Sequence, residues 1–367
     1  MKRKCLAIGI ILLFIGTTII PTTAQKIEKS SSSSSRGNWL YVGGSGPGNY
    51  STIQEALNNT QDGDTVFVYR GNYSFFFHPG DTTDYTCCAV IKHSINLIGE
   101  DKNDTIVYGP GRFDVVSIRT NHVTVSGFTI QHGGIPGTGA YGRGLDIQQR
   151  SNVTVSNIIL KDNYLGIILY WDKNIVVDNI SFVSNGGGID FWDGENCTVR
   201  YCTFEHAGIS HGGFPPSEAG CSLYIHHNKF LNDSSIGMDE HCDDSFGTTT
   251  IESNLFQNNS CALSISSSKG VNVVKNNFIQ NTKNVALSQE AFILQFLINK
   301  RNSQNWVENY WDDWNHNGGY PIPGKMTLDI GIPFIFHFTF VLIPLPVLKI
   351  PYKEYDPNPA PQPYQIP

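Results

Sequence analysis

Four carboxylates are candidates to act together in catalysis. They are Asp190, Asp193, Asp239 and Glu240. A pair of carboxylic acids cleaves a glycosidic bond with retention at a separation of about 5–5.5 Å, and with inversion at about 6.5–9.5 Å. The sequence therefore offers these four residues as candidate catalytic groups of a glycoside hydrolase.

A polysaccharide lyase is another way to use the same carboxylates. A lyase would need calcium held by carboxylates, and a base such as Arg143 or Arg150 to take a proton next to a uronate carboxylate. The segment Asp239-Glu-His-Cys-Asp-Asp244 has enough acid groups to bind a cation, but not the spacing of a calcium loop or a zinc site. We therefore predict no metal site and no cofactor, with calcium as the one candidate.

A second group of residues is suited to binding sugars. Tyr170 and Trp192 are 22 residues apart, with Asp146 before them and His211 after them. Aromatic rings stack on the apolar faces of pyranoses, and carboxylates accept hydrogen bonds from sugar hydroxyls. We predict Asp146, Tyr170, Trp192 and His211 as substrate-binding residues, with His211 on a turn or insertion.

A repeat in the chain has to position these groups. Within each unit apolar and polar residues alternate, which is the period of a strand. A repeat period of roughly 20 to 30 residues indicates a solenoid. A propeller blade needs roughly 40 residues, and a leucine-rich repeat needs leucines at fixed short spacings, which this chain lacks. The sequence predicts an all-β, single-stranded right-handed parallel β-helix with an N-terminal capping helix. Each unit has one large apolar anchor, and from Leu160 onward successive anchors are 22 to 26 residues apart. The anchors are Ile130, Leu160, Phe182, Phe204, Phe230, Phe256 and Phe278.

Stacking the coils brings distant residues together. Alternation directs Ile189 and Phe191 inward and Asp190 outward. Because neighbouring coils are about 4.8 Å apart, we expect the aromatic and acidic candidates to share one outer face. Asparagines recur at matching positions, either as buried ladders or as ordinary turn residues. They are Asn157 with Asn179, and Asn228 with Asn254 and Asn276.

Composition divides the chain into four parts. Residues 1–24 read as a secretory signal, 25–38 as a Ser-rich linker, 39–314 as the β-helix and 315–367 as a Pro-rich extension packed on the last coils. The apolar tract 330–350 contains several prolines, so we expect no transmembrane helix in the mature chain. Export to the cell surface, the extracellular space or the periplasm follows from the signal.

The net charge, the cysteines and the glycosylation sequons limit the partners and modifications that we expect for this chain. The net charge is −7 without a basic stripe, which argues against nucleic acid as a partner. Seven cysteines remain after signal removal, and we expect each to be a small buried side chain. Nine Asn-X-Ser/Thr sequons predict a glycoprotein: Asn49, Asn58, Asn72, Asn103, Asn152, Asn179, Asn196, Asn232 and Asn258.

Three short motifs near the N-terminus resemble the cap and first coil of pectin-lyase-like β-helix proteins. They are Thr52-Ile-Gln-Glu-Ala-Leu, Gly63-Asp-Thr-Val and Gly71-Asn-Tyr. Asn309-Tyr-Trp-Asp-Asp313 resembles the closing motif of the NosD-type family, whose resemblance implies this fold, an envelope location and an association with copper. The sequence does not support copper, because it has three Met and no convergent His/Cys set. The Arg/Asp signatures of pectate lyases and the paired-Asp motifs of polygalacturonases are also missing.

Three functions remain after this reading. The favoured one is an exported, non-enzymatic protein that binds carbohydrate or envelope polysaccharide on an outer sheet face. The second is a polysaccharide lyase or glycoside hydrolase that acts through the outer carboxylates. The third is a purely structural surface protein that binds nothing on that face.

Overall fold

The fold was analysed in a computed structural model. It describes residues 37–74, 87–109, 111–134, 141–212, 222–239, 248–266, 268, 270–292, 303–336 and 339–367. The signal segment, the Ser-rich linker up to residue 36 and the stretches 213–221 and 240–247 are among the residues that lie outside these ranges.

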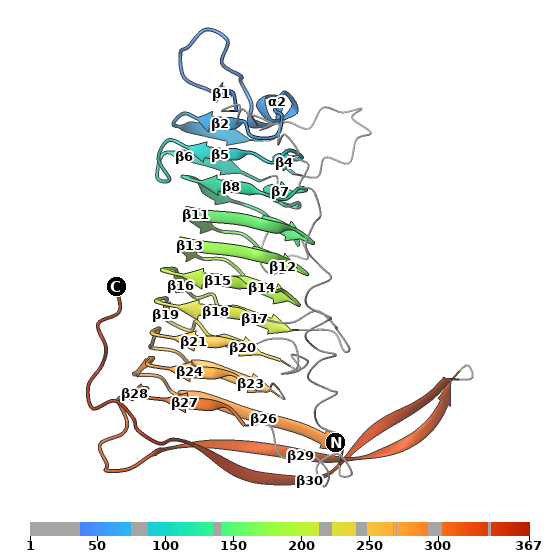
Figure 1. The fold of residues 1–367 in the computed structure, drawn as a ribbon, viewed down its shortest axis with the longest axis vertical. Helices are drawn as coiled ribbons and strands as arrows, with labels where there is room; N and C mark the ends of the chain where they lie inside the picture. Colours follow the sequence, from blue (N-terminus) through green and yellow to red (C-terminus); the bar gives the residue numbers. More distant parts are fainter. Residues whose placement is uncertain are drawn as a thin grey trace, which may run out of the picture. The chain divides into compact units, whose positions relative to one another are not determined.

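The chain is a parallel β-solenoid whose coils contribute strands to two sheets (Figure 1). The first sheet has 19 strands: β1 (Trp39–Val42), β2 (Thr65–Val68), β3 (Gly71–Ser74), β5 (Asn96–Gly99), β6 (Thr105–Tyr108), β8 (Val123–Ser126), β9 (Thr129–Gln131), β11 (Ser151–Lys161), β13 (Lys173–Val183), β15 (Cys197–Arg200), β16 (Thr203–Glu205), β18 (Leu223–His226), β19 (Lys229–Leu231), β21 (Thr250–Glu252), β22 (Leu255–Gln257), β24 (Asn272–Val274), β25 (Asn277–Ile279), β27 (Asn305–Val307) and β28 (Tyr310–Trp311).

The second sheet has 11 strands and carries the predicted site residues. They are β4 (Ala89–Ile91), β7 (Val116–Ile118), β10 (Arg143–Gln148), β12 (Leu165–Tyr170), β14 (Ile189–Trp192), β17 (Ile209–Gly212), β20 (Ile236–Met238), β23 (Leu263–Ser266), β26 (Val285–Phe292), β29 (Tyr320–Phe336) and β30 (Thr339–Asp356). Only β29 and β30 pair in antiparallel fashion among these strands.

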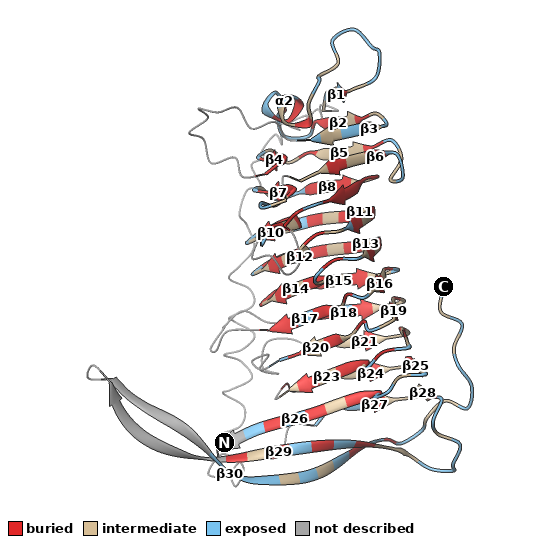
Figure 2. Ribbon diagram, turned by 180° about the vertical axis from the view of Figure 1, so that it is seen from behind, coloured by how far each residue is buried: buried red, intermediate tan, exposed pale blue. Residues whose placement is uncertain are grey.

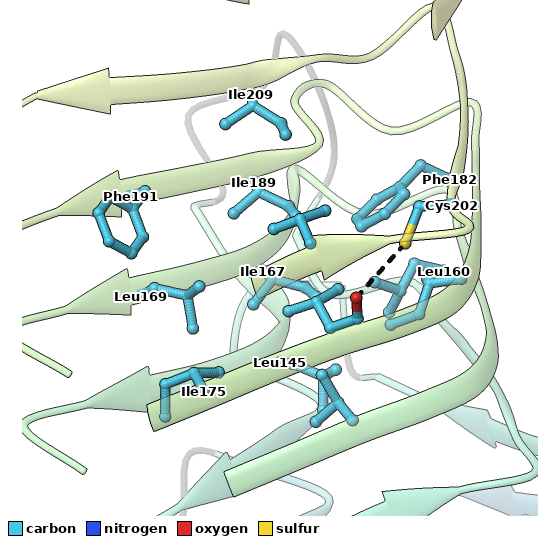
Figure 3. Close-up of a cluster of buried hydrophobic side chains, with 14 of the residues drawn as sticks. Leu145, Leu160, Ile167, Leu169, Ile175, Phe182, Ile189, Phe191, Cys202 and Ile209 are labelled. Carbon is cyan, nitrogen blue, oxygen red and sulfur yellow. Dashed lines mark hydrogen bonds between the residues drawn. The ribbon is translucent and has the colours of Figure 1, made fainter. Parts of the chain in front are cut away.

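The register between coils equals the sequence repeat. In the pair β11–β13, Val155 lies beside Val177 and Leu160 beside Phe182. The inward residues of the second sheet also stack, so that Ile167, Ile189 and Ile209 lie one above another (Figure 3). Because alternate residues of each strand face the interior, buried and accessible residues alternate along the strands (Figure 2).

Aromatic rings form a continuous interior column, as the repeat predicts. The rings of Phe182 and Phe204 are stacked with centroids 4.4 Å apart, and those of Phe204 and Phe230 are 4.7 Å apart. The column continues through Phe256, Phe278, Trp311 and Tyr320 with neighbouring rings within 10° of parallel. Residues far apart in the sequence are therefore vertical neighbours.

One asparagine ladder is buried, and it ends on a carboxylate. Asn228, Asn254 and Asn276 bond one another in sequence, and Asn309 continues the ladder. Asp356 ends it, because its carboxylate accepts from the Asn309 backbone N–H at 2.8 Å and side-chain amide at 3.0 Å. The other predicted pair, Asn157 with Asn179, is exposed, so there the reading of ordinary turn asparagines is the better one.

A short helix, α2 (Ile53–Asn58), packs its apolar side on the first coil. Thr52 is the N-cap, and Glu55 bonds back to it to complete a capping box. Ile53, Ala56 and Leu57 are buried against the core. This is the predicted N-terminal capping helix.

At the other end, β29 and β30 form a hairpin that pairs with β26 through residues 324–329 of β29. Residues 330–336 and 339–350 of the apolar tract lie in the strands of this hairpin as extended chain. Within the residues that the structure describes, no helix has the length and apolar character to cross a membrane.

Two of the cysteines that were predicted to be buried lie in the core, close to each other along one coil. Cys197 and Cys202 are 2% and 1% exposed. The thiol of Cys202 donates to the Arg200 carbonyl at 3.2 Å, and burial raises the pKa of this thiol to about 12. Cys202 therefore behaves as a small apolar side chain at neutral pH, as expected from its sequence.

Candidate functional site

The outer face of the second sheet carries two columns of outward residues. One column contains Ser117, Asp146, Ile168, Asp190, Ser210 and Gly237. The other, which we call the outer strip, contains Gln148, Tyr170, Trp192 and Gly212. Arg119, the first residue after β7, extends this strip by one coil, and its side chain reaches the outer face at Asp146. With coils about 4.8 Å apart, the strip runs about 20 Å along the stack. Tyr170 and Trp192 are neighbours on it, as the sequence repeat predicts.

A groove of about 430 Å³, which we call the glycine groove, opens beside the outer strip. Glycines line much of its floor, and at Gly188 and Gly208 close contacts between coils leave no room for a side chain. A Cβ at Gly188 would lie 2.2 Å from the Gly208 carbonyl oxygen, and one at Gly208 would lie 2.1 Å from that of Ser235. The lining residues are Tyr164, Leu165, Gly186, Gly187, Gly188, Ile189, Asp190, Gly208, Ile209, Ser210, Ser235 and Gly237.

Asp190 supplies the carboxylate of the glycine groove. It is half-buried on β14, between Ile168 and Ser210 of the neighbouring strands. No other carboxylate is among the groove's lining residues. Asp190 therefore faces outward as predicted, two residues before Trp192 of the outer strip.

Two tryptophans frame this part of the sheet. Trp192 is half-buried, and a Cβ at Gly212 on the next strand would lie 3.5 Å from its ring. Trp171, which the sequence analysis did not select, is 44% exposed and lies 4.8 Å from the Tyr170 ring. No signal in the sequence distinguishes it, since Asp193 follows Trp192 in the same way and is buried.

Asp193 does not face the glycine groove. It is 1% exposed and has a left-handed backbone, with φ of 44°. Its carboxylate accepts a hydrogen bond from the Trp171 indole at 3.1 Å. The sequence placed it outward because alternation was continued past the end of β14, where the chain has already turned. Its geometry is that of a turn residue that fixes Trp171.

Asp146 faces outward as expected but is only 2% exposed. Its oxygens bind Arg143 at 3.1 Å and Arg119 at 3.4 Å, and they accept hydrogen bonds from Ser117 and Gln148. The predicted direct contact of Asp146 with a sugar is therefore blocked by its partners. Arg143, the candidate base of a lyase, is also paired with Asp114 at 3.6 Å.

His211 lies inside the coil instead of on a turn or insertion. It belongs to β17, is 1% exposed and stacks on the Phe191 ring at 5.0 Å. Its inward direction follows from the register, which pairs His211 with Phe191 and with Met238. The sequence analysis missed this because the shorter coil before Ile209 shifts the repeat from 22 to 20 residues at this sheet.

Asp239 is exposed and follows β20 at the level of the outer strip, while Glu240 lies outside the described residues. Asp239 is two coils beyond Asp190 and two residues further along the strand direction. These offsets place the two backbone positions about 12 Å apart.

Asp172 is a buried carboxylate that the sequence analysis passed over. It accepts the backbone N–H of Arg150 at 2.6 Å and that of Tyr170 at 2.7 Å, and so holds the end of β12. Burial raises the pKa of Asp172 to about 7 although these hydrogen bonds oppose the shift. The chain after β12 thus turns around the carboxyl group of Asp172, whose pKa lies near neutral pH.

We expect the free energy of unfolding to fall as pH rises from about 4 to about 7 through the titration of Asp172. The folded protein binds this proton more tightly than the unfolded chain, so the stabilisation is complete below the unfolded pKa of about 3.9 and lost above the folded one. Between pH 5 and 8 the loss should be about 2 kcal/mol. Urea unfolding of the wild type and of Asp172→Asn at both pH values measures it. An equal pH dependence in the variant would contradict the assignment.

No candidate metal site is found among the described residues. Among the described residues, no group of three or more His, Cys, Asp or Glu side chains is arranged to hold a metal ion. The acidic segment after Asp239 that the sequence analysis singled out lies outside the described residues. Calcium there stays a prediction.

Comparison with known proteins agrees with the strand arrangement. Residues 95–244 match the family model described as a right handed beta helix region. The prediction of a right-handed parallel β-helix is thereby confirmed. No curated protein sequence matches this chain. The narrower resemblance to NosD-type proteins stays a prediction.

Solved structures with a similar course of the chain come from proteins with different activities. One is the catalytic domain of an alpha-1,3-glucanase in complex with tetrasaccharides, with 12% identity, a TM-score of 0.48, and 75% of this chain and 58% of that chain covered. Another is a polygalacturonase from Erwinia carotovora ssp. carotovora, with 14% identity, a TM-score of 0.46 and coverage of 79% and 84%.

A third similar structure is a surface adhesin of Streptococcus pneumoniae, with 14% identity, a TM-score of 0.38 and coverage of 75% and 84%. This chain spans 58% of the length of the glucanase chain. Likeness at this level of identity concerns the fold alone, so the function has to be argued from the site.

Proposed function

We propose that the protein binds a carbohydrate chain across the outer strip and the glycine groove. The observation that carries this proposal is the position of Tyr170 and Trp192 on neighbouring coils of one outward column, beside a groove containing Asp190. Aromatic rings offer flat apolar surface to the C–H faces of sugars, and the Asp190 carboxylate accepts hydrogen bonds from hydroxyls. The glycine-lined floor of the groove leaves room for a sugar ring.

Binding without cleavage fits the carboxylates better than hydrolysis. Asp146 and Asp193 are engaged by arginines and by Trp171, which leaves Asp190 as the carboxylate among the residues that line the groove. A hydrolase or lyase using Asp190 is the second candidate, favoured by the presence of this carboxylate in the groove. A purely structural protein would leave Tyr170 and Trp192 without a ligand.

The proposal includes export of the protein to the cell envelope, with the mature chain beginning at Gln25 and carrying glycans at its sequons. Its support is the sequence of the first 24 residues and the accessibility of the sequon asparagines, none of which is buried. N-terminal sequencing and intact-mass measurement of protein from the native source test this part. A chain that retains Met1 in the cytoplasmic fraction would contradict it.

Trp192→Ala should weaken binding to a responsive glycan at least about tenfold. The substitution removes one of two stacking rings, and buried aromatic anchors at binding surfaces contribute about 2 kcal/mol or more. A glycan array identifies the ligand, and isothermal titration calorimetry of the purified proteins measures its dissociation constant.

Trp39→Ala is the matched control, because Trp39 is 55% exposed on β1 of the other sheet. It should bind like the wild type. If Trp192→Ala binds unchanged, or if the wild type binds no glycan on the array, the proposed site is wrong. Each responsive glycan is also incubated with the protein and assayed for new reducing ends and for the absorbance of unsaturated ends. Cleavage that Asp190→Asn abolishes would replace binding by catalysis.

A further inference from the structure

We propose that the outer strip selects polysaccharides that carry negative charge, and that Arg119 recognises the anionic group. This inference rests on the proposed carbohydrate function and adds the chemical class of the ligand. The charge of the whole chain gives no hint of it, since the net charge is −7. The indication is the local arrangement of cations at the β7 end of the strip.

Asp146 acts as a positioning residue for two arginines. Its carboxylate lies in the sheet's outer face with 2% exposure, and its two oxygens bind different guanidinium groups. Arg143 reaches Oδ1 at 3.1 Å and Arg119 reaches Oδ2 at 3.4 Å. A buried carboxylate that binds two long side chains restricts where their charged ends lie, which lowers the entropy cost of binding a ligand there.

Arg119 has donors left for a ligand. Its side chain is 47% exposed, and within the described residues its contact with a carboxylate uses one nitrogen, Nη2. A guanidinium has five N–H donors in a planar fork that matches the oxygens of a carboxylate, sulfate or phosphate. Arg143 is less suitable, because it is 30% exposed and already lies between Asp114 and Asp146.

Structural pairing alone does not account for Arg119. Asp146 already accepts from Arg143, Ser117 and Gln148 without it. An arginine added only to satisfy Asp146 would be redundant, and a half-exposed ion pair contributes little to stability. An accessible guanidinium on a rigid, buried anchor is instead the usual arrangement of an anion-binding residue.

Arg119 is also placed to act together with the aromatic residues. It lies in the outer strip, one coil from Gln148 and three coils, about 14 Å, from Trp192. Lys92 follows Ile91, which pairs with Ile118, so this exposed cation is one coil further along the same column. A polymer that stacks on Tyr170 and Trp192 and runs along the strip would therefore bring its acid groups to Arg119 and Lys92.

The test compares Arg119→Gln with the wild type on charged and neutral forms of one polymer. The probes are a polyuronate and the same polymer with its carboxyl groups reduced to alcohols, with a sulfated and a phosphodiester-linked polysaccharide as further arms. The wild type should bind at least one anionic polymer more tightly than the neutral one, and rising salt should weaken that binding. Arg119→Gln should weaken anionic binding about tenfold, flatten its salt dependence and leave neutral binding unchanged.

Two further variants separate recognition from folding. Arg119→Lys keeps the charge without the fork and should recover part of the anionic affinity. Lys283→Gln makes the same charge change at an exposed turn residue before β26 and should bind like the wild type. Circular dichroism and thermal unfolding check that all three variants fold.

The outcomes distinguish this inference from the proposed function. If the wild type binds neutral and anionic polymers equally through Trp192, the carbohydrate function stands and the inference is wrong. If Arg119→Gln weakens both polymers alike, Arg119 supports the sheet and does not recognise charge, which also overturns the inference. If the wild type binds none of the polymers, the proposed function itself fails.

Discussion

Phe230→Ala is expected to lower the free energy of unfolding by about 3–5 kcal/mol. Phe230 is fully buried, and its ring lies between those of Phe204 and Phe256 with centroids 4.7 and 4.9 Å away. The substitution removes buried apolar surface, leaves a cavity and interrupts two ring contacts in the middle of the column. Since each coil is supported only by its neighbours, the coils on both sides should lose stability.

Urea denaturation followed by far-ultraviolet circular dichroism measures this loss. Phe113→Ala is the control, because Phe113 is 41% exposed, and it should change the free energy of unfolding by less than about 0.5 kcal/mol. A loss for Phe230→Ala no larger than that of the control would mean that the aromatic column does not stabilise the solenoid.

Asn254→Ala should cost about 2–4 kcal/mol through lost hydrogen bonds. The Asn254 amide oxygen accepts from the backbone N–H of Asn228 at 2.9 Å and from its side chain at 3.0 Å. Its amide nitrogen donates to the Ile225 carbonyl and to Asn276. Alanine leaves these buried partners without their hydrogen bonds, and a buried polar group without a partner costs more than the bond itself contributes.

Asn305→Ala is the matched change at the surface, where Asn305 donates to Asn272. It should be nearly neutral in the same urea measurement. Asn254→Asp tests the hydrogen-bond chemistry, since it keeps the accepting oxygen but turns the donor that faces Ile225 and Asn276 into an acceptor. Equal stability of Asn254→Ala and the wild type would show that the buried ladder is incidental to folding.

The sequence determined the repeat and therefore the interior of this protein. Large apolar residues at intervals of 22 to 26, such as Phe204, Phe230 and Phe256, can be buried in short alternating strands only if successive coils lie on one another. The same regularity predicted the ladder through Asn254 and the adjacency of Tyr170 and Trp192. Periodicity is a local property of the chain, so it can be read without knowing distant contacts.

Only the tertiary structure decided which outward or turn residues are accessible. Asp193 lies just past the end of a strand, His211 follows a coil that is two residues shorter, and Asp146 is covered by arginines from other parts of its own and the neighbouring coil. The glycine groove arises where backbones of successive coils come too close for a Cβ. Coil length, the ends of strands and contacts between side chains depend on residues far apart in the sequence, and these set the direction and cover of each side chain.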